Sequence, residues 1–444
     1  MRSGLKRFLL CLCVLMAAGA AHCRAQAGAQ DVCVKTSAGP YRLLVSVHPP
    51  ASVPGAAGVD VRTEDADVRV VSVSLPGGSP QTLQRFTTEQ IFTGSIWVGR
   101  GGAWRVVIHV KGAKGDAETT VAVPVSSDTT TGIARFNRPQ WWGLGLVLVV
   151  CVALIVGRRS RVVALVGSAL IGIIFVVAVV ASLRRPTATP TMQVAMIGDG
   201  RLRLSLPGDM SDLVDDHEHR MHLFAVREPE MDVMLHLHPQ ETAPGQFEVM
   251  LPAMAPGEFR LFSNVMHRDG SVQTFTADAG LPVEAGGVLS GDDSVGVVPG
   301  LSRAAVVSGP GTTSVRLMDG YSMTLDLSQE LRARAGQLLR FALTDPAGDP
   351  PTDMQMYMGM QAHADVIKTD GTAFAHIHPV GMIGMTADGG GSTGSDMSAM
   401  AMPSGAANEI SLPVGFPSEG RYRVFLQMKH GGIIETGAFD LNVH

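Results

Sequence analysis

The chain carries one histidine pattern twice, and this repeat constrains its fold more than any other feature. A lone histidine, a His-x-His-Pro and a Met/His pair that closes an aromatic strand follow one another between Met221 and His267, and again between Gln361 and His430. The repeated histidines are His222, His236, His238 and His267 in the first copy, and His363, His376, His378 and His430 in the second. Retention of these histidines in two otherwise different copies indicates that imidazole chemistry is used twice, or that the histidines are structural in both copies.

The spacing of turn residues predicts β-sandwich domains. Short Val, Leu and Phe runs are separated by Pro-Gly, Asp-Gly and Gly-Gly breaks, as in all-β proteins. A length of 444 residues favours about three domains. The formal net charge of −5 gives no basic patch that would suit a nucleic acid. We therefore expect three immunoglobulin-like β-sandwiches, at residues 31–128, 191–286 and 312–444.

Two further segments connect or interrupt these domains. Residues 287–311 contain many Gly, Ser and Val residues and few large side chains, which predicts a linker. Residues 383–407 are rich in Gly, Ser and Met. Such a segment cannot form a core alone, so it is expected to be a loop inserted into the last domain.

The N-terminus has the features of a secretory signal peptide. Basic residues precede an apolar stretch, and Ala25-Gln26-Ala27 provides a small-x-small cleavage site, so residues 1–27 are expected to be removed. Lipidation at Cys23 is the alternative. Only Cys33 would then remain in a soluble domain, which excludes an intrachain disulfide framework there. A metal site would have to use histidine, methionine and carboxylate ligands.

Two apolar runs predict a transmembrane hairpin after the first domain. Residues 141–157 and 162–183 are 17 and 22 residues long, close to the length that spans a bilayer. Arginines between them predict a cytoplasmic tip. With the signal peptide, this places the chain in the inner membrane, with its soluble domains facing the periplasm or cell exterior. A helical hairpin buried in a soluble core is the alternative.

The His-x-His pairs have the spacing of a metal site on a strand. Residues at i and i+2 share one face, roughly 6.6 Å apart along the chain, and two imidazoles can lean from there onto one ion with bonds of about 2 Å. The proline after each pair is expected to end the strand. One site is predicted per repeat: His236 and His238 with His222, Met266 and His267, and His376 and His378 with His363, Met428 and His430. Structural rings bonded to backbone are the alternative.

Methionine indicates which metal such sites would take. The chain has 23 methionines, including an alternating run at Met354, Met356, Met358 and Met360. Thioether and imidazole without thiolate favour copper, Cu(I) in particular, whereas packing in a core is the alternative use of methionine. His217 and His219 could extend the first site. In the second copy, Met358 and Met360 stand near the places of Glu218 and His219, so the two ligand sets are expected to differ.

The segments HEHRMHLFAV, LHLHP and PGEFRLFSN, and their counterparts from PPTDMQMYMGMQAHADV to GAFDLNV, resemble a family of secreted bacterial proteins of poorly defined function. Its members pair two such modules and are often labelled heavy-metal-binding or copper-associated. The resemblance covers residues 200–444 and implies extracytoplasmic sandwiches that handle metal. Residues 31–128 with their anchor are weakly similar to FixH/YtkA-like domains.

Three functional hypotheses follow. The first is a membrane-anchored periplasmic protein that binds copper for tolerance, trafficking or delivery, with a copper transporter or a cuproprotein as its partner. The second is a metal-free scaffold or assembly module whose histidines are structural. The third is a copper-dependent, monooxygenase-like enzyme, although the sequence contains no nucleophile elbow, phosphate loop or catalytic triad, and we expect no enzymatic activity.

Overall fold

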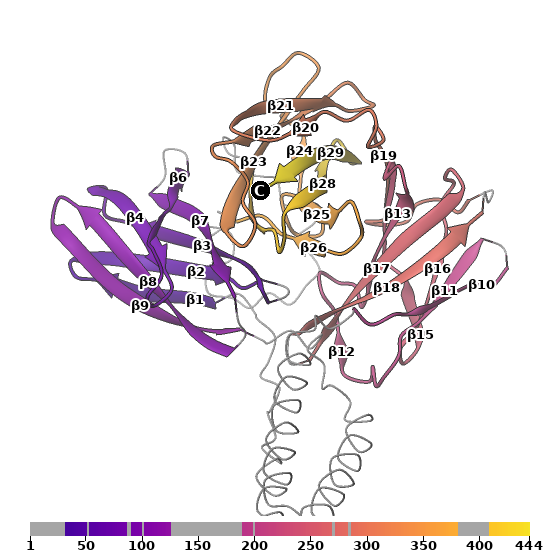
Figure 1. Cartoon of the computed structure of the whole chain (residues 1–444), viewed down its shortest axis with the longest axis horizontal. Coiled ribbons are helices and arrows are strands. Elements are labelled where there is room, and N and C mark those ends of the chain that lie inside the picture. Colours follow the sequence, from indigo (N-terminus) through magenta and orange to yellow (C-terminus); the bar gives the residue numbers. More distant parts are fainter. Residues whose placement is uncertain are drawn as a thin grey trace, which may run out of the picture.

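The structure is a computed structural model. It describes residues 32–50, 53–86, 90–99, 102–125, 189–198, 200–268, 271–282, 286–380 and 408–444. These residues form strands, turns and bends. Three β-rich units are visible in Figure 1: a first domain (32–125), a first module (189–298) and a second module (306–444), which lies between the other two.

The predicted fold class is corrected in its helical part. The described residues are all-β, and they include no apolar helix with the length needed to cross a bilayer. The fold class that we report therefore has no two-helix hairpin, and a membrane is not retained as a partner. The two segments predicted to form the hairpin, 141–157 and 162–183, lie outside the described residues, as do the predicted signal peptide and the loop at 383–407.

The first domain consists of two sheets packed face to face. One sheet has the order β1-β2-β3-β7-β6 and the other β5-β4-β8-β9. Alternate valines point inward from both sheets, so that Val45, Val59, Val71 and Val110 are inaccessible to solvent. The strands are β1 (Val32–Ala38), β2 (Tyr41–His48), β3 (Gly55–Thr63), β4 (Val68–Ser74), β5 (Gln81–Thr82), β6 (Gln84–Phe86), β7 (Ile91–Val98), β8 (Gly102–Gly112) and β9 (Gly115–Val125).

The first module is also built from two sheets. A four-stranded sheet has the order β10-β11-β16-β15, and a six-stranded sheet has the order β12-β17-β13-β14-β19 with β18 paired to β17. The strands are β10 (Gln193–Met196), β11 (Arg201–Ser205), β12 (Leu213–Val214), β13 (His222–Glu228), β14 (Val233–Leu237), β15 (Gln240–Ala243), β16 (Gln246–Met250), β17 (Gly257–His267), β18 (Val272–Leu281) and β19 (Ser294–Val297). The segment predicted as a linker thus supplies a strand of this sheet.

The second module repeats this arrangement. Its six-stranded sheet has the order β20-β29-β28-β25-β26 with β24 paired to β28, and its other sheet has the order β21-β22-β23-β27. Strands β25, β26, β28 and β29 take the places of β13, β14, β17 and β18. The strands are β20 (Val306–Val307), β21 (Gly311–Arg316), β22 (Ser322–Leu327), β23 (Gly336–Thr344), β24 (Met354–Gln355), β25 (His363–Lys368), β26 (Phe374–Ile377), β27 (Glu409–Gly415), β28 (Gly420–His430) and β29 (Ile433–Val443).

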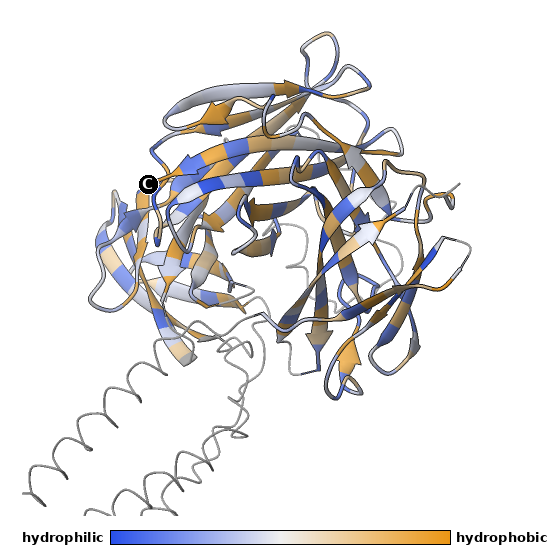
Figure 2. Cartoon of the chain, turned by 45° about the vertical axis from the view of Figure 1, so that its right-hand side comes forward, coloured by the Kyte–Doolittle hydropathy of each residue, from blue (hydrophilic) through white to orange (hydrophobic). Residues whose placement is uncertain are grey.

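The two modules bury the outer faces of their six-stranded sheets against each other. Successive side chains of a strand point to opposite faces, and Figure 2 shows the resulting alternation of polar and apolar residues along the strands. On β13, Leu223 and Ala225 enter the module's own core, whereas Phe224 and Val226 belong to an apolar cluster shared with Ile367 and others of the second module. Each fully buried large apolar side chain contributes roughly 1.5–3 kcal/mol. The same outer faces carry His222 and His236 in the first module and His363 and His376 in the second.

A buried arginine forms hydrogen bonds across this interface. Arg423 on β28 has no exposed surface, and its guanidinium donates to both oxygens of the buried Asp440 carboxylate. Its Nη1 also donates to the carbonyl oxygens of Met231 (2.7 Å) in the first module and of Pro299 (2.9 Å), which directly follows that module. Loss of Arg423 would leave the buried carboxylate with Arg421 as its remaining cationic partner and two carbonyls unpaired, so the docking of the modules depends on Arg423.

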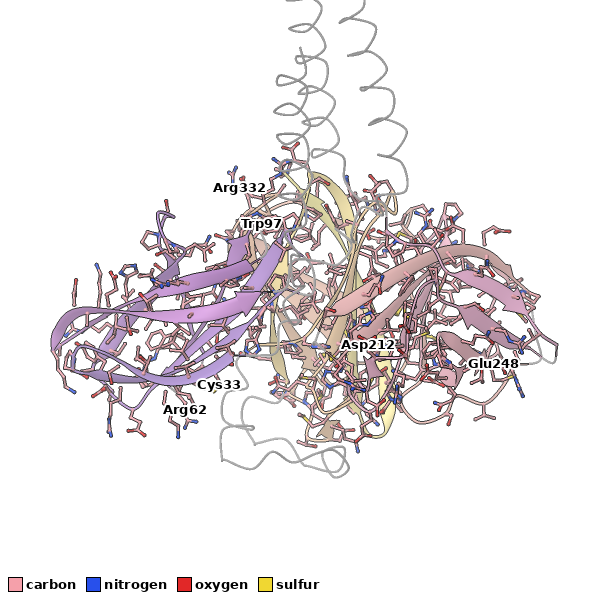
Figure 3. All side chains as sticks on the ribbon, turned by 90° about the horizontal axis from the view of Figure 1, so that it is seen from below. Cys33, Arg62, Trp97, Asp212, Glu248 and Arg332 are labelled. Carbon is pink, nitrogen blue, oxygen red and sulfur yellow. The ribbon has the colours of Figure 1, made fainter. Side chains whose placement is uncertain are left out.

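The first domain packs against the second module, on the side away from the first module. Strands β3 and β7 approach β23 and β27 so closely that a Cβ atom at Gly336 would lie 2.7 Å from the Cα of Ile96. Trp97, labelled in Figure 3, lies at this contact, 2.7 Å from the Cβ position of Gly415. The second module therefore touches both of the other units.

Candidate metal centre

The two copies of the histidine pattern meet at the interface between the modules. His222 on β13 and His236 on β14 point into it from the first module, and His363 on β25 and His376 on β26 point into it from the second. The rings of His222 and His376 stack at 6.0 Å, and those of His236 and His376 lie 5.7 Å apart. The histidines predicted to form two separate sites thus form two adjacent sites.

Three histidines of the first module form the first triad: His222, His236 and His238. One ring nitrogen from each lies within 4.8 Å of the other two, and all three residues are buried. Nδ1 of His222 and Nε2 of His236 are 3.3 Å apart. Two nitrogens bound at about 2 Å to a tetrahedral ion lie roughly 3.3 Å from each other, so this pair already has the spacing of two ligands.

The outer nitrogens of the first triad all face oxygen acceptors. Nε2 of His222 donates to the carbonyl oxygen of Asp216 (3.0 Å). Nδ1 of His236 donates to Oε1 of Gln427 in the second module (2.8 Å). Nδ1 of His238 donates to the carboxylate of Asp293 (3.0 Å), which also accepts the backbone N–H of His238. Metal-bound histidines are held by such bonds, which fix the tautomer and the ring orientation.

The second triad, His363, His376 and His378, has the same geometry. Its ring nitrogens also lie within 4.8 Å of one another, and Nδ1 of His363 is 3.2 Å from Nε2 of His376. Nε2 of His363 donates to the carbonyl oxygen of Tyr357 (3.0 Å), and Nδ1 of His376 contacts the carboxylate of Asp365 (2.9 Å). Each site therefore has one histidine held by a backbone carbonyl and another held by a carboxylate.

Burial keeps these histidines uncharged. It lowers the pKa of His222, His236, His363 and His376 well below the usual value, and neighbouring imidazoles lower each of them further. Burial also lowers the pKa of His238. A neutral imidazole is the form that binds metal, so an ion would displace few protons at neutral pH. The described residues thus contain two clusters of histidines that could hold a metal ion.

Two tight turns of the same geometry adjoin the triads. In the first module, Asp216 and His219 exchange two backbone hydrogen bonds, with positive φ at His217 (49°) and Glu218 (71°). The ring of His217 reaches the second triad, with its centroid 4.8 Å from that of His378. His219 stacks on His238 at 3.8 Å. The sequence predicted that both would extend the first site, but the structure brings His217 to the second.

The alternating methionines do not share one extended face. Met354 begins in β24 and lies in the second module's core, but the chain then turns, with positive φ at Met358 (49°) and Gly359 (74°). Tyr357 and Met360 exchange two backbone hydrogen bonds across this turn. The run is therefore the counterpart of the turn that carries His217.

The residues predicted as fourth ligands lie outside both triads. His267 bonds to Asp212 (2.8 Å) and Gln273 (3.0 Å), and its neighbour Met266 pairs with Val214 and Val272 in the sheet. Met428 is buried in the second module's core. His430 pairs with Asp319 (2.9 Å), and with Glu435 these residues form a separate group that could hold an ion. We remove Met266, His267, Met428 and His430 from the ligand sets of the triads.

Four residues that orient the ligands were not identified from the sequence: Asp293, Tyr357, Asp365 and Gln427. Asp365 follows His363 by two residues, so its position on the same strand face was a readable signal. Asp293 lies in the segment predicted as a linker. Gln427 and Tyr357 act on the first triad from the second module, and no local pattern reveals a contact between modules.

One protein-family model matches both modules. A family model described as "Domain of unknown function (DUF8832)" matches residues 188–281 and 314–444, just over half of the chain. The chain therefore belongs to this family, and the matched segments contain both triads. No curated protein matches the chain.

Several solved structures show weak similarity to the chain. A tetra-tandem repeat from the extending region of a large adhesion protein has 9% identity and a TM-score of 0.16, covering 88% of this chain and 71% of that one. The D1–D4 ectodomain fragment of ICAM-5 has 9% identity and a TM-score of 0.16, covering 90% and 76%. The titin domains I67–I69 have 8% identity and a TM-score of 0.16, covering 90% and 97%. Similarity at this level carries no argument about fold or function.

Proposed function

We propose that this chain is an extracytoplasmic copper-binding protein that holds one copper ion at each triad and serves copper tolerance, trafficking or delivery. A copper transporter or a cuproprotein would be the partner that supplies or receives the ion. The resemblance of its repeats to secreted heavy-metal-binding proteins supports this assignment, as does its N-terminal signal-like sequence.

The observation that carries the proposal is the direction of the hydrogen bonds around the first triad. The carbonyl of Asp216 can only accept, so Nε2 of His222 holds the proton and Nδ1 presents a lone pair. The Tyr357 hydroxyl donates to the carbonyl of Asp292 (2.8 Å), so it too can only accept from His236, whose Nε2 therefore presents a second lone pair. These two lone pairs face each other at 3.3 Å with no proton between them.

A bound cation would remove the repulsion between these two lone pairs. Two facing lone pairs repel each other, and Nε2 of His238 is a third buried nitrogen without a hydrogen-bond partner among the described residues. Buried polar atoms of this kind are rare and require an explanation. An ion at the meeting point would satisfy all three nitrogens at once.

The ligands and their charges favour copper, and Cu(I) in particular. Imidazoles without thiolate suit copper, although they also suit zinc. Three neutral imidazoles bring no charge, and the second triad contacts one fully buried carboxylate, that of Asp365. A monovalent ion beside an ionised Asp365 gives a neutral buried group, whereas a divalent ion leaves one uncompensated charge in a medium where such a charge is costly.

The test is copper content and copper affinity of the purified full chain. We define a first-triad variant (His236→Gln with His238→Gln) and a second-triad variant (His376→Gln with His378→Gln). We expect two equivalents of Cu(I) in the wild type, one in each variant and none when all four substitutions are combined. His109→Gln is the matched control, because His109 pairs with Glu118 in the first domain, away from both triads.

Zinc competition and thermal melting separate the alternatives. Cu(I) should raise the melting temperature of the wild type by binding the folded state, and an excess of zinc should not displace it. If the wild type binds no copper, and the variants merely melt earlier than the control without metal, the histidines are structural and the chain is a metal-free scaffold. If zinc displaces copper completely, the assignment of copper is wrong.

A further inference from the structure

We infer that the two sites exchange their fourth ligands: His217 of the first module completes the second triad, and Met358 of the second module completes the first. This inference rests on the proposed function, because it assigns ligands to the same ions. It gives four imidazoles to the second site, and three imidazoles and a thioether to the first.

The position of His217 is the first observation. Its ring meets the rings of His378 (4.8 Å) and His363 (5.8 Å) edge-on, at interplanar angles of 90° and 83°. The nearest ring of its own module's triad is that of His222, at 6.5 Å. His217 is therefore closer to the triad of the other module than to its own.

The equivalence of the two turns is the second observation. Residues 216–219 and 357–360 form turns with the same reciprocal backbone bonds and with the same φ of 49° at their second residue, which is His217 in one and Met358 in the other. In both turns the first residue's carbonyl accepts a hydrogen bond from the first histidine of its own triad, at 3.0 Å. Met358 thus stands in its module where His217 stands in the other.

The contacts of Tyr357 place the second turn at the interface between the modules. Its side chain crosses the interface, and its hydroxyl contacts Nδ1 of His236 (3.3 Å) and the carbonyl oxygen of Asp292 (2.8 Å), both in the first module. The second turn therefore reaches the first triad, just as the first turn reaches the second triad. Met358 is the next residue and is only 6% exposed. Met358 is not one of the side chains that form the second module's apolar core.

Two consequences follow from crossed ligands. The site with a thioether is the softer one and should bind Cu(I) more tightly than the site with four imidazoles. Each ion would also bond to residues of both modules. Copper binding would then stabilise the interface, as the contacts of Arg423 do. Copper affinity and the docking of the modules are then linked.

The test uses full chains in which one triad has been removed. In the second-triad variant only the first site remains, and Met358→Leu should lower its Cu(I) affinity by about 10–100-fold or more, the loss that follows even from removing a residue that orients a ligand. It should also remove a sulfur neighbour of copper from the X-ray absorption spectrum. In the first-triad variant the same loss of affinity should follow from His217→Asn. Asparagine tolerates positive φ, so this change leaves the turn unstrained.

Crossed controls decide the assignment. His217→Asn in the second-triad variant and Met358→Leu in the first-triad variant should leave copper affinity within about twofold, as should Met360→Leu in both. If each change instead weakens its own module's site, or neither weakens any site while the wild type still binds two copper ions, the exchange of ligands is wrong and the proposed function stands. If the wild type binds no copper, the proposed function itself fails.

Discussion

Both triads consist of three histidines, but their surroundings differ. In the first, β14 is covered by β19, and all three histidines are buried. In the second, β26 ends its sheet among the described residues, and His376 and His378 are only partly buried. One duplicated motif has thus produced a fully buried triad and a partly buried one.

The triads also differ in how charge is placed beside them. Phe224 occupies the position on β13 that Asp365 occupies on β25, two residues after the first histidine. The carboxylate at the first triad is instead that of Asp293, whose side chain is 15% exposed, whereas that of Asp365 has no exposure. The first site relies on a partly solvated charge and on an amide from the other module. The second has a carboxyl group on its own strand, and that group is fully buried.

Acidic pH should lower the free energy of unfolding of the metal-free protein. The first triad should contribute more to this loss than the second. Burial lowers the pKa of His222, His236 and His238, so the unfolded chain binds more protons than the folded chain below about pH 6.5. The free energy of unfolding should then fall with pH by up to about 1.4 kcal/mol per unit for each histidine. At the second triad, burial raises the pKa of Asp365, so this group favours the folded state at low pH and loses that contribution as pH rises.

Urea unfolding at pH 7 and pH 5 measures this difference. Asp365→Asn removes the opposing group, so it should make the loss of stability between the two pH values larger than in the wild type. Asp278→Asn, at an exposed carboxylate paired with Arg260, is the control and should leave the slope unchanged. Equal stability at both pH values would show that the histidines are not held neutral in the folded state.

Removal of Arg423 should affect both sites together. Arg423→Leu leaves Asp440 buried without its main partner and the carbonyls of Met231 and Pro299 unpaired, which should cost about 3–5 kcal/mol of the free energy of unfolding. Because both sites take contacts from both modules, the two copper affinities should fall in parallel. Arg340→Leu breaks an exposed pair with Asp326 and should cost less than about 1 kcal/mol. Weakening of one site alone would contradict the shared interface.

Substitution of Asp365 and of Asp293 should lower the copper affinities of the two sites by different amounts. Asp365→Asn should lower the Cu(I) affinity of the second site by about 10–100-fold, because the amide keeps a hydrogen bond to His376 but carries no charge to balance the ion. Asp293→Asn should lower the affinity of the first site less, since water already screens that charge. Copper titrations of each variant in the background that retains only the affected site measure both. Equal effects would mean that exposure does not set the difference.

The sequence allowed the histidines of the two triads to be grouped correctly but not their surroundings to be predicted. Alternation along a strand places His236 and His238 on one face whatever the fold, and the repeat indicated that His376 and His378 do the same. It could not show that this face is the interface between modules, because docking depends on side chains from strands distant in the chain. His217 illustrates the limit: the sequence assigned it to the nearest triad, and only the packing of the modules brings it to the other.

His267 and His430 show the same limit, because the sequence predicted them as ligands and the structure places them outside the triads. Each follows an aromatic strand that pairs with the strand of the first histidine, which made both plausible ligands. The register, however, places Asn264 opposite His222 and Gln427 opposite His363, three residues before the predicted ligands. A shift of three residues along a strand moves a side chain about 10 Å and to the other face. No feature of the sequence fixes that register.

The smallest effect is expected from these two residues. His267→Gln and His430→Gln should leave two equivalents of Cu(I) bound at wild-type affinity, because His267 is held by Asp212 and Gln273 and His430 by Asp319. His267→Gln should cost about 1 kcal/mol or less of stability, since Asp212 is half exposed and water replaces the bond. Copper content and urea unfolding of both variants, beside the two triad variants, measure this. Loss of one equivalent in either variant would return that histidine to the site that the sequence predicted, and a loss in the His430 variant would also remove His217 from the second site.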